Sequence, residues 1–158
     1  MAKYSLLEQL HGVKGLDPVA DAFSGTVYSD IISLREHTNI LFIIHKGVGA
    51  TGTSTITVQA CDDISASNSS AVAFRYKAIT STDVQGSLTT ATTAGFALTA
   101  GSSQMYMVEA NVEELLASGY EYIRLKAVEV VNDPVLAGVA VLLSGNRFGP
   151  SATLTTVD

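Results

Sequence analysis

Histidine is the side chain in this sequence best suited to bind a metal ion. The three histidines are His11, His37 and His45. Successive side chains of a strand point to opposite faces, so a strand that presents two imidazoles to one ion needs a His-x-His pair. The eight-residue step from His37 to His45 does not provide that pair. We therefore expect solvated or capping histidines and predict no metal ligands.

A second group with possible chemistry is the acidic and thiol stretch Cys61-Asp62-Asp63. Cys61 has no histidine close in sequence that would activate it, so we expect an inert, buried or half-buried thiol and no nucleophile. Two carboxylates at the start of a loop are weak grounds for a Ca²⁺ site, because no spaced third ligand follows them. Glu113 and Glu114 lie side by side on a predicted helix and point apart, unlike a glycosidase pair. We predict no catalytic residues and no enzyme activity.

The glycine-rich segment 47–52, GVGATG, resembles a phosphate cradle only in composition. A phosphate-binding loop requires a Gly-Lys-Ser/Thr motif and a helix that begins directly after it, and neither follows here. We expect a hairpin loop. The sequence thus predicts no cofactor and no cofactor-binding residue.

Basic residues accompany aromatic residues on two predicted strands. Arg75 and Lys77 share one strand face, and Arg124 shares a face with Tyr122. Such faces can stack on bases or sugars. The chain has only nine basic residues against 15 acidic ones and a net charge of −6, which argues against a nucleic-acid partner. Because Tyr and Arg are enriched at protein interfaces, we expect these residues to contact another subunit or protein.

The composition indicates one domain, or one domain with an arm, whose surface is partly covered by neighbours. The 158 residues are 47% hydrophobic, but only 15% are charged, whereas about 25% is usual. One cysteine excludes an intrachain disulfide and fits assembly in a reducing cytoplasm. We see no signal peptide and no apolar run of about 18 residues, so we predict no membrane partner.

The segment from Tyr120 to Gly145 is the most informative structural pattern. It is two strands joined by a turn at Asn132-Asp133-Pro134. The second strand, Val135 to Leu143, is bulky on one face and thin on the other, where Gly138 and Ala140 lie. This asymmetry predicts an internal strand with something packed closely against its thin side.

Further alternating segments predict an all-β fold. We expect weak edge strands near Ser87–Thr90 and Phe96–Thr99, and a short helix over Val112–Ser118 capped by Asn111. The stronger strand candidates are 27–34, 39–46, 54–61, 72–80 and 104–110. Consecutive strands without long helices between them predict an antiparallel β-sandwich of jelly-roll type with about eight strands.

The first 25 residues differ from the rest of the chain. Ser5 and Glu8 have the spacing of a capping box, which predicts a short helix with Leu6, Leu7 and Leu10 on one face. Asp17-Pro18 predicts a second short helix that presents Phe23. Such helices need a surface to pack against, either one end of their own sheet or a partner. We divide the chain into an N-terminal arm, 1–25, a sandwich domain, 26–145, and an extended tail, 146–158.

Several of these stretches together resemble small structural proteins of tailed bacteriophages and prophages. They are SDIISL at 29–34, the buried strand 39–46, TITVQACD at 55–62, FRYK at 74–77, GYEYIRL at 119–125 and the strand 139–143. The chain is similar in particular to capsid decoration, or cement, proteins. That resemblance implies a non-enzymatic virion protein, made in the bacterial cytoplasm. It would bind the outer surface of the major capsid protein lattice as a dimer or trimer and stabilise the shell.

The resemblance assigns no contact residues, so we predict the interface from the residue types alone. It comprises the apolar N-terminal side chains and the basic and aromatic strand residues: Leu6, Leu7, Leu10, Phe23, Arg75, Lys77, Tyr122 and Arg124. Two other functions stay open at this point. One is another virion component, such as a tail-tube, head-completion or fibre-associated protein. The other is a carbohydrate-binding sandwich for host attachment, which the absence of Trp disfavours.

Overall fold

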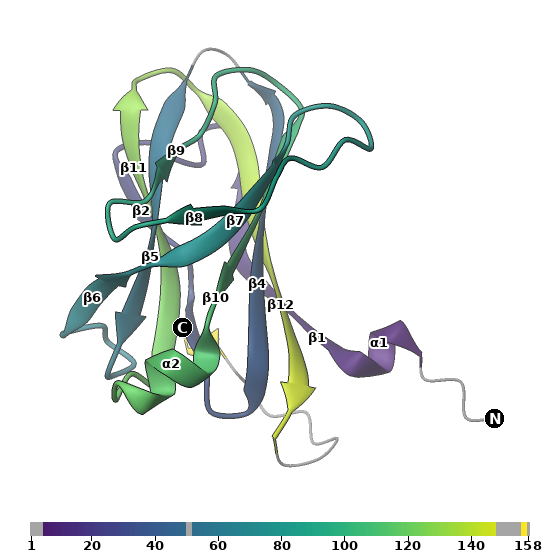
Figure 1. Ribbon diagram of the computed structural model, residues 1–158. Helices are drawn as coiled ribbons and strands as arrows, with labels where there is room; N and C mark the ends of the chain where they lie inside the picture. The colour runs from purple at the N-terminus through teal and green to yellow at the C-terminus, as the bar shows by residue number, and fades with distance from the viewer. Residues whose placement is uncertain (1–4, 50–51, 148–155, 158) are drawn as a thin grey trace.

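Two antiparallel β-sheets packed face to face form the body of the molecule (Figure 1). The computed structural model describes residues 5–49, 52–147 and 156–157. Within them, six strands form one sheet in the order β1-β12-β4-β10-β7-β8. Their bounds are β1 Leu10–Val19, β12 Val135–Asn146, β4 His37–Gly49, β10 Gln104–Ala110, β7 Phe74–Ile79 and β8 Thr89–Ala91.

The second, seven-stranded sheet has the order β13-β3-β11-β5-β6, with β2 paired to β11 and β9 paired to β5. Its strands are β13 Thr156–Val157, β3 Ile31–Ser33, β11 Tyr122–Val131, β5 Thr53–Cys61, β6 Ser69–Val72, β2 Thr26–Tyr28 and β9 Phe96–Ala97. The chain crosses repeatedly between the sheets, for example from β4 to β5 and from β11 to β12. The predicted all-β sandwich is confirmed. The predicted strand 27–34 is divided into β2 and β3, and the weak edge strands expected near Ser87–Thr90 and Phe96–Thr99 are β8 and β9. Strands β1 and β13 were not predicted.

The core lies between the sheets and follows the alternation read from the sequence. Ile40, Phe42 and Ile44 point inward from β4 and are 1% exposed or less. Ile56 and Val58 face them from β5 in the opposite sheet. β-Branched and aromatic side chains fit such a half-buried pleated surface, which explains why these segments form strands.

Strand β12 is internal, as its thin face predicts. It lies between β1 and β4, with Val141 paired to Phe42 on one side and to Val13 on the other. Its bulky residues, including Val139 and Val141, are buried in the core. Pro18 packs on the thin side, so closely that a Cβ added at Gly138 would lie 3.1 Å from its ring. The expectation of a close neighbour there is confirmed.

The predicted second helix at Asp17-Pro18 is wrong, because this segment is the end of β1. Backbone pairing with β12 runs from Leu10 opposite Ser144 to Val19 opposite Ala137, with register shifts near Leu16. A proline can end a strand like this one, because β1 lies at the edge of its sheet. Residues 10–19 therefore belong to the sandwich. The described parts of the predicted arm that lie outside the sheets are Ser5–Gln9 and the turn at 20–25.

Two short helices remain among the described residues. Helix α1, Leu6–Gln9, has the predicted acidic partner, since the Glu8 carboxylate accepts a 3.3 Å hydrogen bond from the Ser5 backbone N–H. Helix α2, Val112–Ala117, is capped by Asn111, as predicted. Gly119, which follows the C-cap Ser118, has a positive φ of 88°. Figure 1 shows α2 at one end of the sandwich, where Val112 and Leu115 are buried.

The predicted C-terminal tail, 146–158, is described only in part. Asn146 is the last residue of β12, and Thr156–Val157 pair with Ile32 and Ile31 as β13. Residues 148–155 and 158 lie outside the described part of the chain. Where it is described, the end of the chain is thus an edge strand of the seven-stranded sheet.

Candidate interaction surfaces

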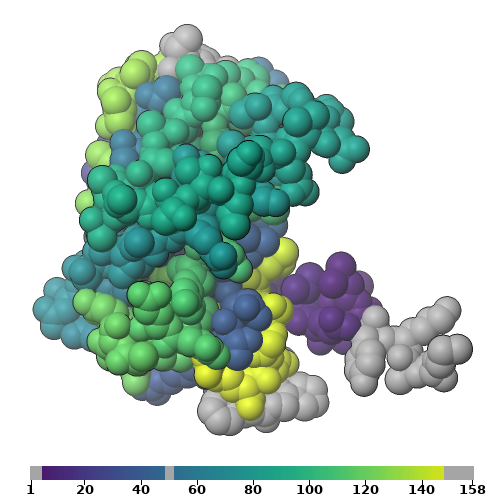
Figure 2. All heavy atoms as spheres, viewed as in Figure 1, coloured from purple at the N-terminus to yellow at the C-terminus, as the bar shows by residue number. Residues whose placement is uncertain are grey.

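The segment Ser5–Gln9, called the arm from here on, stands away from the body of the molecule. Leu6 is 68% exposed and Leu7 is 87% exposed, and helix α1 has no buried residue. Figure 1 shows α1 beyond the edge of the sandwich, and in Figure 2 the same segment projects from the body beside the end of β12. Two leucines thus lie in solvent where the sequence predicts contact residues.

The outer face of the six-stranded sheet is apolar at its centre. Leu41, Ile43 and Met107 point away from the core and are half-buried among one another. Leu142 pairs with Leu41, and Ala140 pairs with Ile43, which continues this apolar surface across β12. Exposed apolar surfaces of this kind are typical of protein contact sites.

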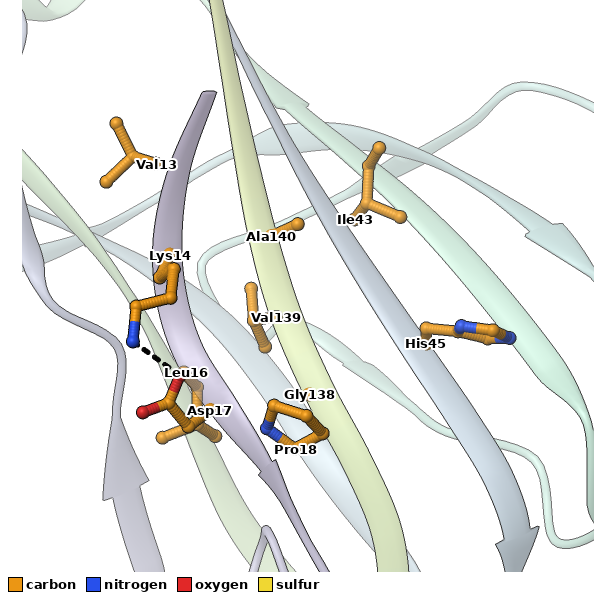
Figure 3. A pocket seen from close by; sticks show the side chains of 10 residues that line it. All are labelled: Val13, Lys14, Leu16, Asp17, Pro18, Ile43, His45, Gly138, Val139 and Ala140. Carbon is orange, nitrogen blue, oxygen red and sulfur yellow. Dashed lines mark hydrogen bonds and ion pairs between the residues drawn. The ribbon is translucent and has the colours of Figure 1, made fainter. Parts of the chain in front are cut away.

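A groove follows the thin side of β12 on this outer face (Figure 3). Its volume is about 350 Å³. Gly138 and Ala140 lie along its middle, with Pro18 on the β1 side and Ile43 on the β4 side. The other lining residues are Val13, Lys14, Leu16, Asp17, His45 and Val139. We call this site the β12 groove. Its form follows from the two small residues that the sequence places on one strand face.

Polar groups of the β12 groove lie at its edges. Lys14 Nζ and Asp17 Oδ1 are 2.9 Å apart and form an exposed ion pair on β1. His45 is an exposed side chain on β4, paired across the sheet with Gly138. An apolar floor with a polar rim is the usual anatomy of a protein contact site.

Arg75 and Lys77 lie on the outer face of the six-stranded sheet, near its other edge. The guanidinium of Arg75 is 2.8 Å from the carboxylate of Glu109, its cross-strand neighbour on β10. Lys77 Nζ donates a 3.3 Å hydrogen bond to Gln85 Oε1. Each cation thus has a local partner, and β10 lies between their strand, β7, and β4, the nearest strand of the β12 groove.

Tyr122 and Arg124 lie on β11, in the opposite sheet. The guanidinium carbon of Arg124 is 3.9 Å from the centre of the Tyr28 ring, and its Nε donates a 3.0 Å hydrogen bond to Gln59. Lys126 Nζ is 5.8 Å from the same ring centre. This arrangement is a cation–π cluster on the outer face of the seven-stranded sheet. The two basic and aromatic pairs predicted from the sequence therefore lie on different sheets and do not form one surface.

The four N-terminal residues predicted to make contacts differ in their exposure to solvent. Phe23 is only 2% exposed and belongs to the core. Leu10 is half-buried at the start of β1, and only Leu6 and Leu7 are largely exposed. Phe23 as a surface contact residue is thus a wrong prediction. It follows from the helix expected after Pro18, where the chain instead leaves β1 and enters the core.

Two histidines meet at the end of the sandwich where the arm begins. The rings of His11 and His37 are stacked with their centres 5.5 Å apart. His37 is 5% exposed, and its Nδ1 has no hydrogen-bond partner among the described residues. Burial, with a smaller effect of His11, lowers the pKa of His37 below its ordinary 6.5. The part of the chain that the structure describes has no cluster of three or more His, Cys, Asp or Glu side chains that would bind a metal ion.

A buried lysine, Lys46, is a feature that the sequence analysis missed. Its side chain is 0% exposed, and Nζ donates a 2.9 Å hydrogen bond to the Thr99 carbonyl oxygen. Burial lowers the pKa of this amine. The alternation along β4 could have predicted this burial, because Lys46 continues the inward-facing positions of Phe42 and Ile44.

The Cys61 thiol and the Asp63 carboxylate, which the sequence singles out, have structural roles. Cys61 is fully buried, and burial raises the pKa of its thiol. Asp63 accepts hydrogen bonds from the backbone N–H groups of Ser65 and Ser67, at 2.9 and 3.1 Å, and from both of their hydroxyls. The bonds from Ser67 contribute most to lowering the pKa of Asp63. These contacts close the loop after β5.

Comparison of the chain with protein-family models, with curated proteins and with solved structures found no match. In the described part of the chain, neither helix has the length and hydropathy needed to span a membrane.

Proposed function

We propose that this protein is a non-enzymatic structural component of a bacteriophage virion. In this role it binds the outer surface of the major capsid protein lattice and stabilises the shell. The capsid assignment comes from the sequence resemblance to decoration proteins. The observation that supports a role in protein contact is the pair of exposed leucines on the arm, Leu6 and Leu7, beside an apolar outer sheet face.

The surfaces of the sandwich suit extended contacts with a repeating lattice. The centre of the six-stranded sheet presents apolar side chains, among them Leu41, Ile43 and Met107. The other sheet presents the polar cluster of Tyr28, Arg124 and Gln59. A protein with an apolar face and a polar, aromatic face can lie on a shell with one and leave the other in solvent. We assign the apolar face to protein contacts and the Tyr28–Arg124 face to the outside.

A shell-binding experiment tests this function. Purified protein is incubated with expanded capsids of the encoding phage from which this chain is absent, and the capsids are sedimented and heated. We expect the protein to sediment with the shells and to raise their melting temperature. Electron microscopy should then show added density over the whole shell. The absence of this chain from purified virions would remove the proposal.

The same imaging distinguishes the other virion roles. Density confined to the tail, or to the single vertex where head and tail join, would identify a tail or head-completion protein. Binding to host polysaccharide without binding to shells would favour a carbohydrate-binding sandwich. Substituting Arg124→Ala on the opposite sheet serves as a control, because shell binding through the apolar face should not change.

A further inference from the structure

We propose that copies of this chain associate by placing the arm of one copy in the β12 groove of another. The contact is between Leu6 and Leu7 of one copy and the surface formed by Gly138, Ala140 and Ile43 of the next. The inference concerns self-association and does not depend on whether the assembled protein binds a capsid.

Among the described residues, the arm buries none of its own side chains. Helix α1 has four residues; it contacts β1, which follows it, and Glu8 and Gln9 line a hollow together with the end of β12 at 144–146. Isolated helices of this length are not stable in water, so a helix that persists needs a tertiary contact for its apolar side chains. Leu6 and Leu7 are adjacent and both exposed, which makes them the side chains that a partner would cover.

The β12 groove has the shape and chemistry that two leucines require. Its floor lacks bulk because Gly138 and Ala140 have small side chains, and Pro18 and Ile43 provide apolar walls. Lys14, which forms an ion pair with Asp17 at the rim of the groove, is a cation that would lie near Glu8 of the docked arm from the other copy. Apolar side chains in a pocket surrounded by polar groups are the arrangement typical of interface anchors.

The reach of the chain favours a second copy as the source of the arm. Pro18 lies eight residues beyond Leu10 along β1, about 26 Å at roughly 3.3 Å per residue. Leu6 lies four residues before Leu10 and can extend at most about 14 Å from it. Folded back along its own sheet, the arm could reach Ala140, which pairs with Lys14, but it would stop short of Pro18 and Gly138. Only the arm of another copy can fill that end of the groove. In Figure 1 the arm projects from the N-terminal end of β1, whereas Pro18 is the ninth residue of that strand.

Every copy carries both an arm and a groove, so each copy can donate and receive. Reciprocal exchange between two copies forms a closed, two-fold dimer, and head-to-tail exchange forms a ring when the rotation between copies closes. Both assemblies leave no arm uncovered. The contact residues are the same in the two cases, and the measured mass distinguishes them.

Disulfide trapping tests the contact directly. A chain carrying Leu7→Cys is mixed with a differently tagged chain carrying Ala140→Cys, and the mixture is oxidised. We expect a disulfide between the two tagged chains. Position 57, on the outer face of the other sheet, provides the matched control, and Thr57→Cys should give no such product with Leu7→Cys. The native Cys61 is fully buried and does not compete.

The mass of the protein in solution provides a second test. We expect light scattering to show a dimer or a ring for the native chain. The double variant Leu6→Ser/Leu7→Ser should weaken association by about a hundredfold or more, since it removes two buried leucines per contact. Ala140→Arg should have a similar effect by filling the groove. The control Val84→Ser/Val130→Ser changes two side chains that are also exposed, by 61% and 62%, and should leave the mass unchanged.

Three results would overturn the proposal. The first is a native chain that is monomeric at the highest soluble concentration. The second is an oligomer whose mass is unaffected by both the arm and the groove variants. The third is a disulfide that forms within one chain in the Leu7→Cys/Ala140→Cys double variant at high dilution, since that result would place the arm on its own sheet.

Discussion

The buried ammonium group of Lys46 in β4 donates a 2.9 Å hydrogen bond to the carbonyl oxygen of Thr99, in the loop between β9 and β10. The same loop is held at a second point, where the Thr99 N–H donates to the Tyr106 hydroxyl at 3.0 Å. Tyr106 in turn donates to Gln104 Oε1. Three buried polar side chains thus fasten this loop to one end of the sandwich.

Replacing this lysine should stabilise the protein. Desolvating an ammonium group costs several kcal/mol, whereas the lost hydrogen bond to Thr99 is worth about 1–3 kcal/mol. We expect Lys46→Met, which keeps the length of the side chain, to raise the free energy of unfolding at pH 7 by about 1–2 kcal/mol. Urea denaturation measures this change. Lys46→Ala is the control, and it should destabilise because it leaves a cavity.

The effect of Lys46 should also depend on pH in a defined direction. The pKa of Lys46 in the folded state is below 10.5, its ordinary value in an unfolded chain. Between the folded and the unfolded pKa, the unfolded chain therefore binds more protons than the folded chain. The stability that Lys46 contributes therefore increases as the pH rises through that window, and Lys46→Met removes this increase. Subtracting the two pH profiles cancels Cys61, which titrates in both proteins. A difference that does not vary up to pH 10.5 would contradict the burial of a charged amine.

The burial of His37 should make the protein lose stability as the pH falls below neutral. Burial lowers the pKa of His37 in the folded protein below 6.5. Between pH 6.5 and that lower pKa, the unfolded chain therefore binds more protons than the folded chain. The native protein should lose stability across that window, while His37→Phe, which keeps a ring against His11, should lose less. Unfolding at pH 7.5 and pH 5 measures the difference. His45→Gln, a change at an exposed side chain, is the control and should follow the native profile.

Cys61 should react with thiol reagents only when the sandwich opens. Its side chain is fully buried, and burial also raises the pKa of the thiol. We expect native labelling to be slower than labelling in denaturant by about a thousandfold or more, which corresponds to ordinary domain stability. The control is Thr57→Cys, because position 57 faces outward on the same strand. Equal rates at the two positions would show that β5 is not buried as described.

Local patterns were sufficient to predict the strands whose side chains alternate. The segment Gln104–Ala110 has the same bounds in the sequence analysis and in the structure. Its inward residues, among them Tyr106 and Val108, are buried, and its outward residues are half-buried. A period of two depends only on the strand itself and the core it faces, so it can be read without knowledge of the partner strands.

Features that depend on distant pairing could not be predicted in this way. Asp17-Pro18 has the local sequence of a helix start, but the flanking residues Leu16 and Val19 pair with β12, more than 110 residues away, and hold it in a strand. For the same reason, Arg75 and Arg124 both have strand patterns, while the sheet to which each belongs is set by its neighbours. The candidate surfaces were therefore predicted residue by residue and not as assembled faces.

Two truncations distinguish the arm from the body. An independent arm over residues 1–25 would imply that the body folds without them, but β1 and Phe23 belong to the sandwich. Removal of 1–25 should expose β12 as a new sheet edge and cause unfolding or aggregation. Removal of 1–9 should leave the circular dichroism spectrum unchanged and abolish self-association, since helix α1 has no buried residue.

Point variants refine the same distinction. Phe23→Ala should cost about 3–5 kcal/mol, as expected for a buried aromatic residue, whereas Leu7→Ala should change stability by no more than about 0.5 kcal/mol when measured in the monomer. Thermal unfolding at low protein concentration keeps association out of the comparison. If removal of 1–9 alone unfolded the monomer, the arm would be part of the core, and the two leucines could not serve as a contact for another copy.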